Sequence, residues 1–295
     1  MIQLTLVQLK AYQARTFCLN PELLLKTPQD AIRFVNERGF VFFWPVKGFT
    51  FPSLWAAVAG DRPVPDDHDD PANITWSWKD DLLDQHVWYY GRVLKHKNAF
   101  ISYDLLPSFY ALSPNYGSPE DDIEEDYRLG HLTLESKLIF DTLLEKGPLD
   151  TINLRKEAHL TGQNSKSPFN RALDQLQRDF RILPTAIADV GAWHYAFKYD
   201  LTHRVYPDLI EEARPISESQ ARRNLVLAHL RSLGVTREHD ITSLFHWEPA
   251  VTHRTVESLK RTGEILPEVF LENSQDAWVG TLEIINKMEG SRINY

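Results

Sequence analysis

The stretch SPFNRALDQLQRDFRILP, residues 167–184, decides how the rest of this 295-residue sequence is interpreted. Ser167-Pro168 is typical of a helix start, because proline fits the first helical position after a capping serine. The next apolar side chains follow the period of an α-helix, and they are Phe169, Ala172, Leu173, Leu176 and Phe180. The stretch ends in Ile182-Leu183-Pro184, which opens a β-rich run. It therefore predicts a helix with one buried face that leads directly into a strand.

The flanking sequence extends this helix into a larger module. Thr133 caps a first helix that ends at Gly147, and residues 151–159 form a second helix. After the third helix, residues 182–187 and 193–197 are β-rich arms around a glycine-containing turn. Three helices followed by a hairpin is the order of a winged helix, in which the third helix recognises DNA and the hairpin is the wing.

A weak internal repeat predicts a second module of the same kind. Ile182-Leu183-Pro184 recurs as Ile265-Leu266-Pro267, a spacing that suits a small domain rather than a solenoid repeat. The expected elements are a helix from Ser217 to about Gly234, helices over 240–246 and 249–262, and hairpin arms over 264–271 and 278–284. The repeat therefore predicts two successive winged helices.

The N-terminal part contains three further helix starts, at Thr5, at Thr27-Pro28 and at Pro52-Ser53. They predict a third winged-helix-like unit. Residues 61–84 are expected to be a loop, 86–112 an aromatic part of the core, and 113–130 an acidic linker. The predicted fold class is α+β, mostly helical, with three tandem winged-helix units that carry β-hairpin wings. The predicted domains are 1–130, 131–213 and 214–295.

The formal net charge of −9 argues against nucleic acid when taken alone. The acids are unevenly placed, however. Residues 61–130 hold 15 acids and 6 bases, and residues 263–295 hold 6 acids and 2 bases. The remaining segments are slightly basic, so the total charge does not exclude DNA. Because the acids are concentrated, we expect the 61–130 region to face away from DNA.

Composition excludes several other classes. The sequence has one cysteine, so it can form neither an intramolecular disulfide nor a cysteine-based zinc site. No apolar run has the length of a membrane span, and the first residues lack the pattern of a signal peptide. The 11 histidines show no metal-binding spacing, and no nucleotide-binding glycine motif occurs. We therefore expect a cytoplasmic protein without cofactor, metal or membrane contact, with a monomer as the favoured state.

Three local features have competing interpretations. The run Asp66–Asp70 offers oxygen ligands for a hard cation, but it lacks the glycine and terminal glutamate of a calcium loop. The run Glu120–Asp126 could mimic nucleic-acid phosphates. Solvated acidic segments are the preferred interpretation of both runs. Cys18 follows Phe17 in an apolar run, so we expect an inert, buried thiol.

The polar faces of the two predicted recognition helices supply the candidate DNA contacts. Arginine and lysine contact phosphates, and arginine and asparagine also contact base edges. A solvated helix face is the alternative, and Asp174 in the first face supports it. The candidates are Lys166, Asn170, Arg171, Arg178 and Arg181 in the first helix, and Arg254, Lys260 and Arg261 in the second.

The segment Gly39-Phe40-Val41-Phe42-Phe43-Trp44-Pro45, followed by Pro52-Ser53-Leu54-Trp55, resembles the YcaQ/AlkZ-like DNA glycosylases. The opening Leu4-Thr5-x-x-Gln8 and the aromatic segment from Trp88 to Tyr110 are also similar to that family. The resemblance covers nearly the whole chain. It implies tandem winged helices, double-stranded DNA as partner, and excision of bulky alkylated bases or unhooking of crosslinks in DNA repair.

In that family, Gln-x-Gln or Gln-x-Asp side chains hold the water that attacks the sugar. The matching positions here are Val41 and Phe43, which cannot position water. Lys47 is a weak candidate for a replacement nucleophile; it could instead contact phosphate or lie in solvent. The leading hypothesis is a DNA-binding protein without standard glycosylase chemistry. An active glycosylase with non-standard residues and a protein-interaction scaffold that has lost DNA binding are the alternatives.

Overall fold

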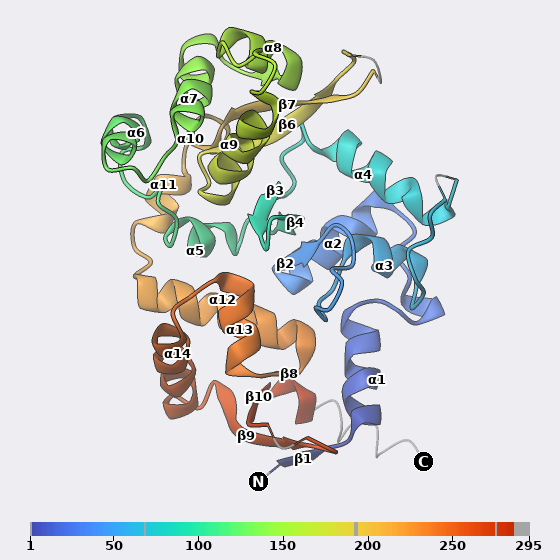
Figure 1. The fold of residues 1–295 in the computed structure, drawn as a ribbon. Helices are drawn as coiled ribbons and strands as arrows, with labels where there is room; N and C mark the ends of the chain where they lie inside the picture. The colour runs from blue at the N-terminus through green and yellow to red at the C-terminus, as the bar shows by residue number, and fades with distance from the viewer. Residues whose placement is uncertain (1, 68, 192–193, 275, 286–295) are drawn as a thin grey trace. The chain divides into compact units, whose positions relative to one another are not determined.

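The computed structural model describes residues 2–67, 69–191, 194–274 and 276–285, and helices make up about half of them (Figure 1). Packing divides the chain into two compact units. Unit 1 contains Met1–Thr75 and Glu218–Tyr295, and unit 2 contains Trp76–Ser217. Among the described residues, no helix is both long and apolar enough to cross a membrane.

Unit 2 contains the module around the stretch 167–184. Its strands follow the sheet order β5-β7-β6, and residues along the hairpin pair from Ile182↔Leu201 to Ala188↔Ala196. The elements of the module are α7 (Leu134–Lys146), β5 (Leu149–Asp150), α8 (Thr151–Glu157), α9 (Lys166–Arg178), β6 (Ile182–Ala188) and β7 (Ala196–Leu201). The expected helices and the expected hairpin are therefore present. Trp193, in the second expected arm, lies outside the described residues.

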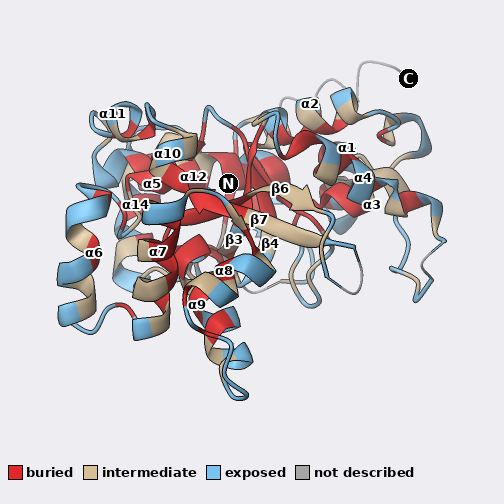
Figure 2. Ribbon diagram, turned by 90° about the horizontal axis from the view of Figure 1, so that it is seen from above, coloured by how far each residue is buried: buried red, intermediate tan, exposed pale blue. Residues whose placement is uncertain are grey.

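The periodic apolar side chains of helix α9 are buried, as the sequence predicts. Phe169, Ala172, Leu173 and Leu176 belong to one core cluster with residues of α7 and α8. Figure 2 shows buried and exposed residues on different sides of this helix. Burial of this apolar face stabilises the module, at roughly 1.5–3 kcal/mol for each large side chain removed from water.

The start of α9 differs from the prediction. The helix begins at Lys166, because the carbonyl of Ser165 accepts the first helical bond from the amide of Phe169, at 2.9 Å. The Ser165 hydroxyl donates to the carbonyl of Gly162 at 2.6 Å, so it does not cap the helix. The predicted cap at Ser167 is therefore wrong by two residues, and Pro168 lies within the first turn.

Unit 1 contains a second module with the same order of elements. Its sheet has the order β1-β9-β10-β8, in which β1 (Ile2–Leu4) adds parallel to β9. The elements are α12 (Glu218–Leu233), β8 (Val235–Thr236), α13 (Glu238–Phe245), α14 (Pro249–Arg261), β9 (Ile265–Leu271) and β10 (Trp278–Thr281). The repeat around Ile265-Leu266-Pro267 therefore marks a second helix-and-hairpin module, to which the N-terminus contributes a strand.

The three N-terminal helices begin at the predicted residues. Thr5 and Thr27 each accept a bond from the third residue of their helix and form capping boxes, and Ser53 caps the third helix. The elements are α1 (Leu6–Thr16), a 3₁₀ turn η1 (Pro21–Leu23), α2 (Pro28–Arg38), β2 (Phe40–Phe42), α3 (Leu54–Ala59) and a 3₁₀ turn η2 (Pro71–Asn73). A hydroxyl that accepts an otherwise unpaired amide hydrogen stabilises a helix start by about 1 kcal/mol, which explains why these starts are readable from sequence.

Two segments expected to be irregular are helical. Helix α4 (Ile74–Leu82) replaces the end of the predicted loop 61–84, because Trp78 and Leu82 fall one helical turn apart and are both buried. Helix α6 (Pro119–Arg128) replaces most of the predicted linker 113–130. Ile123 of this helix is buried, and the acids in its first turn are favourable at a helix N-terminus.

The aromatic segment 86–112 lies in the core of unit 2, as predicted. Tyr89, Tyr90 and Phe100 are fully or almost fully buried. The elements are β3 (Tyr89–Leu94), β4 (Lys97–Ile101) and α5 (Leu106–Tyr110), and unit 2 is completed by α10 (Thr202–Val205) and α11 (Leu209–Ala213). Strands β3 and β4 form an antiparallel hairpin.

Candidate nucleic-acid interface and the altered motif

Helix α9 presents polar side chains opposite its buried face. Lys166, Asn170 and Arg171 are all exposed, and Arg171 donates to the hydroxyl of Ser167 at 2.6 Å. Among the described residues, neither Lys166 nor Arg171 forms an ion pair with an acid. Two cations and an amide on one exposed face can contact phosphates and base edges. The structure therefore keeps these three predicted residues together and accessible.

The C-terminal half of the α9 face is less available. Arg178 is exposed, but its guanidinium lies 3.2 Å from the carboxylate of Asp179. Asp174 forms an ion pair with Arg92 at 2.6 Å, which offsets the negative charge on this face. Arg92 comes from strand β3, so no pattern within the helix could have predicted this contact.

Arg181 is not part of an exposed face. Its side chain is 1% exposed and forms an ion pair with Asp126 of helix α6. The sequence assigned Arg181 to DNA contact because it extends the polar face by one turn. The chain leaves the helix at Arg178, so Arg181 instead enters the core beside α6.

The acidic run Glu120–Asp126 is partly neutralised within unit 2. Besides the Asp126–Arg181 pair, Glu124 lies 3.2 Å from Lys137 and Glu120 lies 3.3 Å from His203. These contacts dock α6 onto the module, so the run is not a freely solvated linker. In the other acidic run, Asp70 makes a bidentate ion pair with Arg62 at 2.7 and 2.8 Å.

Helix α14 has a more acidic environment than α9. Arg254 and Arg261 are exposed and form no ion pair with any acid among the described residues. Lys260, in contrast, donates to Glu257 of the same helix at 2.8 Å. The pKa of the exposed Glu257 carboxyl is lowered by this hydrogen bond and by the charge of Lys260. The second predicted face is therefore exposed but carries its own negative charge.

A group that the sequence did not predict lies beside this face. Glu238, His253 and Glu257 offer one nitrogen and two carboxylate oxygens within 4.8 Å of one another. His253 Nδ1 lies 3.1 Å from Glu238, which is 15 residues earlier in the sequence. Nitrogen and carboxylate ligands suit zinc and similar ions. Sequence spacing missed the group because α13 and α14 bring its members together.

The two positions that match the family's water-holding side chains are buried. Val41 and Phe43 are both 0% exposed. The backbone around them is held by bonds from Phe42 N to Pro52 O and from Trp55 N to Phe43 O, both 3.0 Å. An apolar side chain cannot donate to or accept from a water molecule. The segment therefore has the packing of a core and none of the side-chain chemistry that the resemblance implies.

Lys47, the weak candidate for a replacement nucleophile, follows this segment. Its side chain is exposed in the turn between Val46 and Phe49, beside Gly48 with a φ of 76°. A nucleophilic lysine needs burial or a neighbouring charge to lower its pKa. An exposed turn provides no burial, so the interpretation as a solvated side chain or phosphate contact fits better.

A buried lysine occurs elsewhere, in unit 2. Lys79 of helix α4 is 0% exposed, and its ammonium group donates to the hydroxyl of Tyr195 at 2.7 Å and pairs with Asp80. The ring of Phe197 lies 4.6 Å from the same nitrogen. Burial lowers the pKa of Lys79, while Asp80 acts in the opposite direction. These contacts attach α4 to the β6–β7 hairpin, and sequence analysis assigned residue 79 to a loop.

Cys18 has no reactive environment. Burial raises the pKa of its thiol to about 11, so the thiol is protonated near neutral pH. Cys18 is half-buried rather than buried as expected, and its inertness stays a prediction.

The fold is similar to that of a solved DNA glycosylase, and the segment that contains Val41 and Phe43 is an apolar, buried part of it. A family model described as AlkZ related matches residues 25–246, and the chain belongs to this family. The DNA glycosylase AlkZ of Streptomyces sahachiroi has a similar structure, with a TM-score of 0.63 and 12% sequence identity over 98% of this chain and 72% of that chain. No curated protein sequence matches.

Proposed function

We propose that this protein binds double-stranded DNA through tandem winged-helix units and does not carry out base excision by the chemistry of its glycosylase relatives. Membership of the AlkZ-related family and the fold shared with the DNA glycosylase AlkZ support a role in DNA repair. The order of helices and strands supports winged helices in both repeated modules, since each has its first strand next to the last in the sheet. The three helices of residues 1–60 are the basis for a third unit.

The observation that carries the DNA proposal is the exposed face of α9. Lys166, Asn170 and Arg171 stand on the third helix of a helix-and-hairpin module, where such folds contact the major groove. Their neighbour Asp174 is paired with Arg92 and opposes DNA less than an unpaired carboxylate would. The local charge favours a phosphate backbone even though the whole chain is acidic.

The proposal of altered chemistry rests on Val41 and Phe43. Hydrolysis of the bond between base and sugar needs a positioned water, and both side chains that would hold it are replaced by buried hydrocarbon. A carboxylate or amide at these positions would have to be buried within an aromatic cluster, which costs free energy without a partner. We therefore expect binding without release of alkylated bases.

Two assays on the same protein test these claims. Fluorescence anisotropy with a labelled duplex at low salt measures binding, and we expect saturable binding that Lys166→Glu with Arg171→Glu weakens strongly. Incubation with duplexes that carry alkylated bases or a crosslink measures excision, and we expect no release above the protein-free control. Absence of binding by the wild-type protein contradicts the DNA proposal and favours an interaction scaffold. Base release contradicts the proposed loss of chemistry.

A further inference from the structure

Helices α13 and α14 of unit 1 are packed against each other through a shared core. Ile241 of α13 and the α14 residues Val256 and Leu259 are all 0% exposed and belong to one hydrophobic cluster. Beside this cluster, the hydroxyl of Thr242 donates to the hydroxyl of Thr252 at 2.8 Å. Side chains that start from two packed helices keep a fixed relative position better than side chains on loops. The pair therefore provides a rigid base for polar groups at its surface.

Three such groups, from the two helices, meet at one place. His253 and Glu257 are one helical turn apart on α14, a spacing that puts two metal ligands on the same side of a helix. Glu238 lies in the first turn of α13, and its carboxylate is 3.1 Å from Nδ1 of His253. Bonds of about 2.0–2.2 Å to a zinc ion set neighbouring ligand atoms about 3–3.5 Å apart. The observed separation is therefore that of two ligands on one ion.

The group is accessible from solvent. The side chain of Glu238 is 33% exposed, that of Glu257 is 49% exposed and that of His253 is 63% exposed. An ion can therefore enter without any movement of the core. Three protein ligands leave at least one coordination position for water, as in zinc sites that bind a further ligand.

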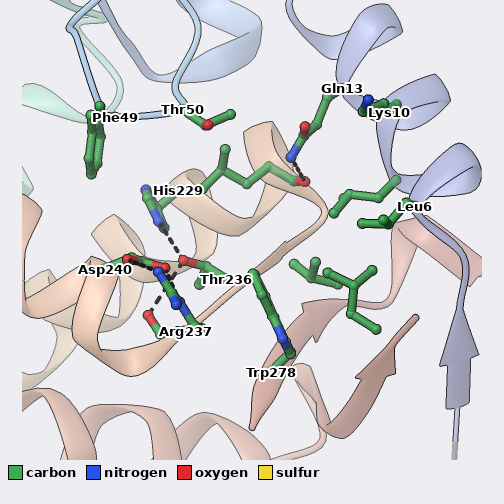
Figure 3. Close-up of a pocket in the computed structure, with 15 residues that line it drawn as sticks. Leu6, Lys10, Gln13, Phe49, Thr50, His229, Thr236, Arg237, Asp240 and Trp278 are labelled. Atoms are coloured by element: carbon green, nitrogen blue, oxygen red, sulfur yellow. Dashed lines mark hydrogen bonds and ion pairs between the residues drawn. The ribbon is translucent and has the colours of Figure 1, made fainter. Parts of the chain in front are cut away.

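The charges near the group favour a divalent cation. Its two carboxylate oxygens lie within 4.8 Å of each other, where like charges repel. Lys260 pairs with one of them at 2.8 Å and offsets a single charge. Arg237, which precedes Glu238, is engaged with Asp240 at 2.8 and 3.0 Å (Figure 3) and with Asp276 at 3.0 Å. A divalent ion between the carboxylates replaces their repulsion by attraction.

The donor atoms define the class of ion. One imidazole nitrogen and two carboxylate oxygens suit Zn²⁺ and related transition metals, whereas Mg²⁺ and Ca²⁺ prefer oxygen ligands alone. Within the described residues, this is the one group of three such side chains. Exposed pairs of a histidine and an acid, such as His194 with Asp189, offer only two ligands. The third ligand distinguishes the α13–α14 group from such pairs.

We propose that Glu238, His253 and Glu257 bind one Zn²⁺ ion, or an ion of the same class, on the surface of α13 and α14. The ion adds two positive charges to the α14 face, which otherwise carries its own acids. The exposed Arg254 and Arg261 on the same helix then face a phosphate backbone without an opposing negative charge. The metal site stands on the geometry alone, and its effect on DNA affinity rests on the proposed DNA binding.

Isothermal titration calorimetry with Zn²⁺ and the full-length, chelator-treated protein tests the site. We expect one site per chain that is weakened at least tenfold in His253→Gln and in Glu238→Gln, because loss of a group that only supports a ligand already costs about 10–100-fold. His239→Gln is the matched control. The side chain of His239 is 84% exposed, next to Glu238 and outside the group, so this variant should bind Zn²⁺ like wild type. Mg²⁺ in place of Zn²⁺ should bind much more weakly.

Fluorescence anisotropy with a labelled duplex tests the consequence. Affinity is measured with Zn²⁺ and with EDTA for each protein, and the ratio of the two values removes the effect of the substitution on charge. We expect Zn²⁺ to raise the affinity of the wild-type protein about three- to tenfold at low salt. The ratio should be close to one for His253→Gln and wild-type for His239→Gln.

The outcomes of the two assays are separable. No Zn²⁺ binding, equal Zn²⁺ binding in wild type and both glutamine variants of the group, or equal affinity for Mg²⁺ overturns the metal site and leaves the proposed function intact. Zn²⁺ binding at the site with an unchanged duplex affinity overturns its effect on DNA. Zn²⁺ binding by a protein that binds no duplex in either condition supports the metal site and contradicts the proposed function.

Discussion

The helices α9 and α14 occupy the same place in two repeated modules, yet their exposed faces differ in charge. On α9, Lys166 and Arg171 form no ion pair with an acid among the described residues, and the acid of this helix face, Asp174, is paired with Arg92. On α14, Lys260 is paired with Glu257, and His253 faces Glu238. The two modules share the same order of helices and strands, so that order alone does not determine whether the exposed face of the third helix is suited to DNA.

This difference in charge predicts which of the two helices contributes more to DNA affinity. A phosphate contact gains from a cation that is not already paired, whereas a paired cation must first lose its partner. We therefore expect α9 to dominate DNA affinity and α14 to make a smaller contribution.

Among the substitutions, the largest effect is expected at the end of α9, where Arg181 is predicted to serve the fold and Arg178 the surface. Arg181→Ala removes a 1% exposed guanidinium and leaves Asp126 without its arginine, so we expect the free energy of unfolding to fall by about 3 kcal/mol. Urea denaturation checks this value. Arg178→Ala is the control, because this side chain is exposed and its change should stay within about 0.5 kcal/mol. Equal, small losses for both would show that Arg181 is not structural.

The next effect concerns binding. Lys166→Glu with Arg171→Glu reverses two exposed charges, and we expect about a 100-fold weaker affinity for duplex DNA at low salt, because phosphate contacts become repulsive. Arg254→Glu on α14 should weaken binding by less. Arg33→Glu on α2, at a 65% exposed side chain, is the control and should bind like wild type. A larger loss from Arg254→Glu would reverse the ranking of the two helices.

The stability of the module that contains α14 is expected to depend on pH through His229. Burial lowers the pKa of His229 to about 3, below the unfolded value of about 6.5. As the pH falls through 6.5, the unfolded state binds a proton that the folded state does not. This group should therefore lower the free energy of unfolding by about 1.4 kcal/mol per pH unit between about pH 6.5 and pH 3.

Urea denaturation across this pH range measures the slope. His229→Phe removes the titrating group, so its slope should be flatter than that of the wild-type protein. Parallel slopes would show that His229 is accessible to protons in the folded state.

The smallest predicted effect concerns the acid on the exposed face of α14. Glu257→Gln removes a negative charge from the α14 face and releases Lys260, so we expect duplex affinity to rise about two- to threefold at low salt. Anisotropy measures the change, and raising the salt should reduce it. A loss of affinity would mean that Glu257 takes part in binding.

Local signals in the sequence predicted much of the fold. Thr5, Thr27 and Ser53 act through neighbours three residues away, and Phe169 to Leu176 follow one helical period, so short windows contain the relevant physics. Helices α4 and α6 were predicted as a loop and a linker because these segments are rich in Pro and acidic residues. The few side chains that they bury, such as Trp78 and Ile123, do not form a clear helical pattern. Their burial depends on packing against distant segments.

The candidate site was less predictable for the same reason. The accessibility of Lys166 and Arg171 followed from the helical period. The burial of Arg181 depends on Asp126, and the neutralisation of Asp174 depends on Arg92, at a separation of 82 residues. A cavity lined by residues of α1 and α12 joins segments that lie far apart in the sequence (Figure 3). The periodicity of either segment does not predict that contact.

The most direct test is the salt dependence of duplex affinity for the wild-type protein and the variant Lys166→Glu with Arg171→Glu. Counterion release predicts a linear fall of log K with log salt concentration, and loss of two phosphate contacts should reduce the slope by about 2. We expect this reduction for the α9 variant. An unchanged slope, or no wild-type binding at low salt, would contradict the claim that α9 is the principal DNA-binding face.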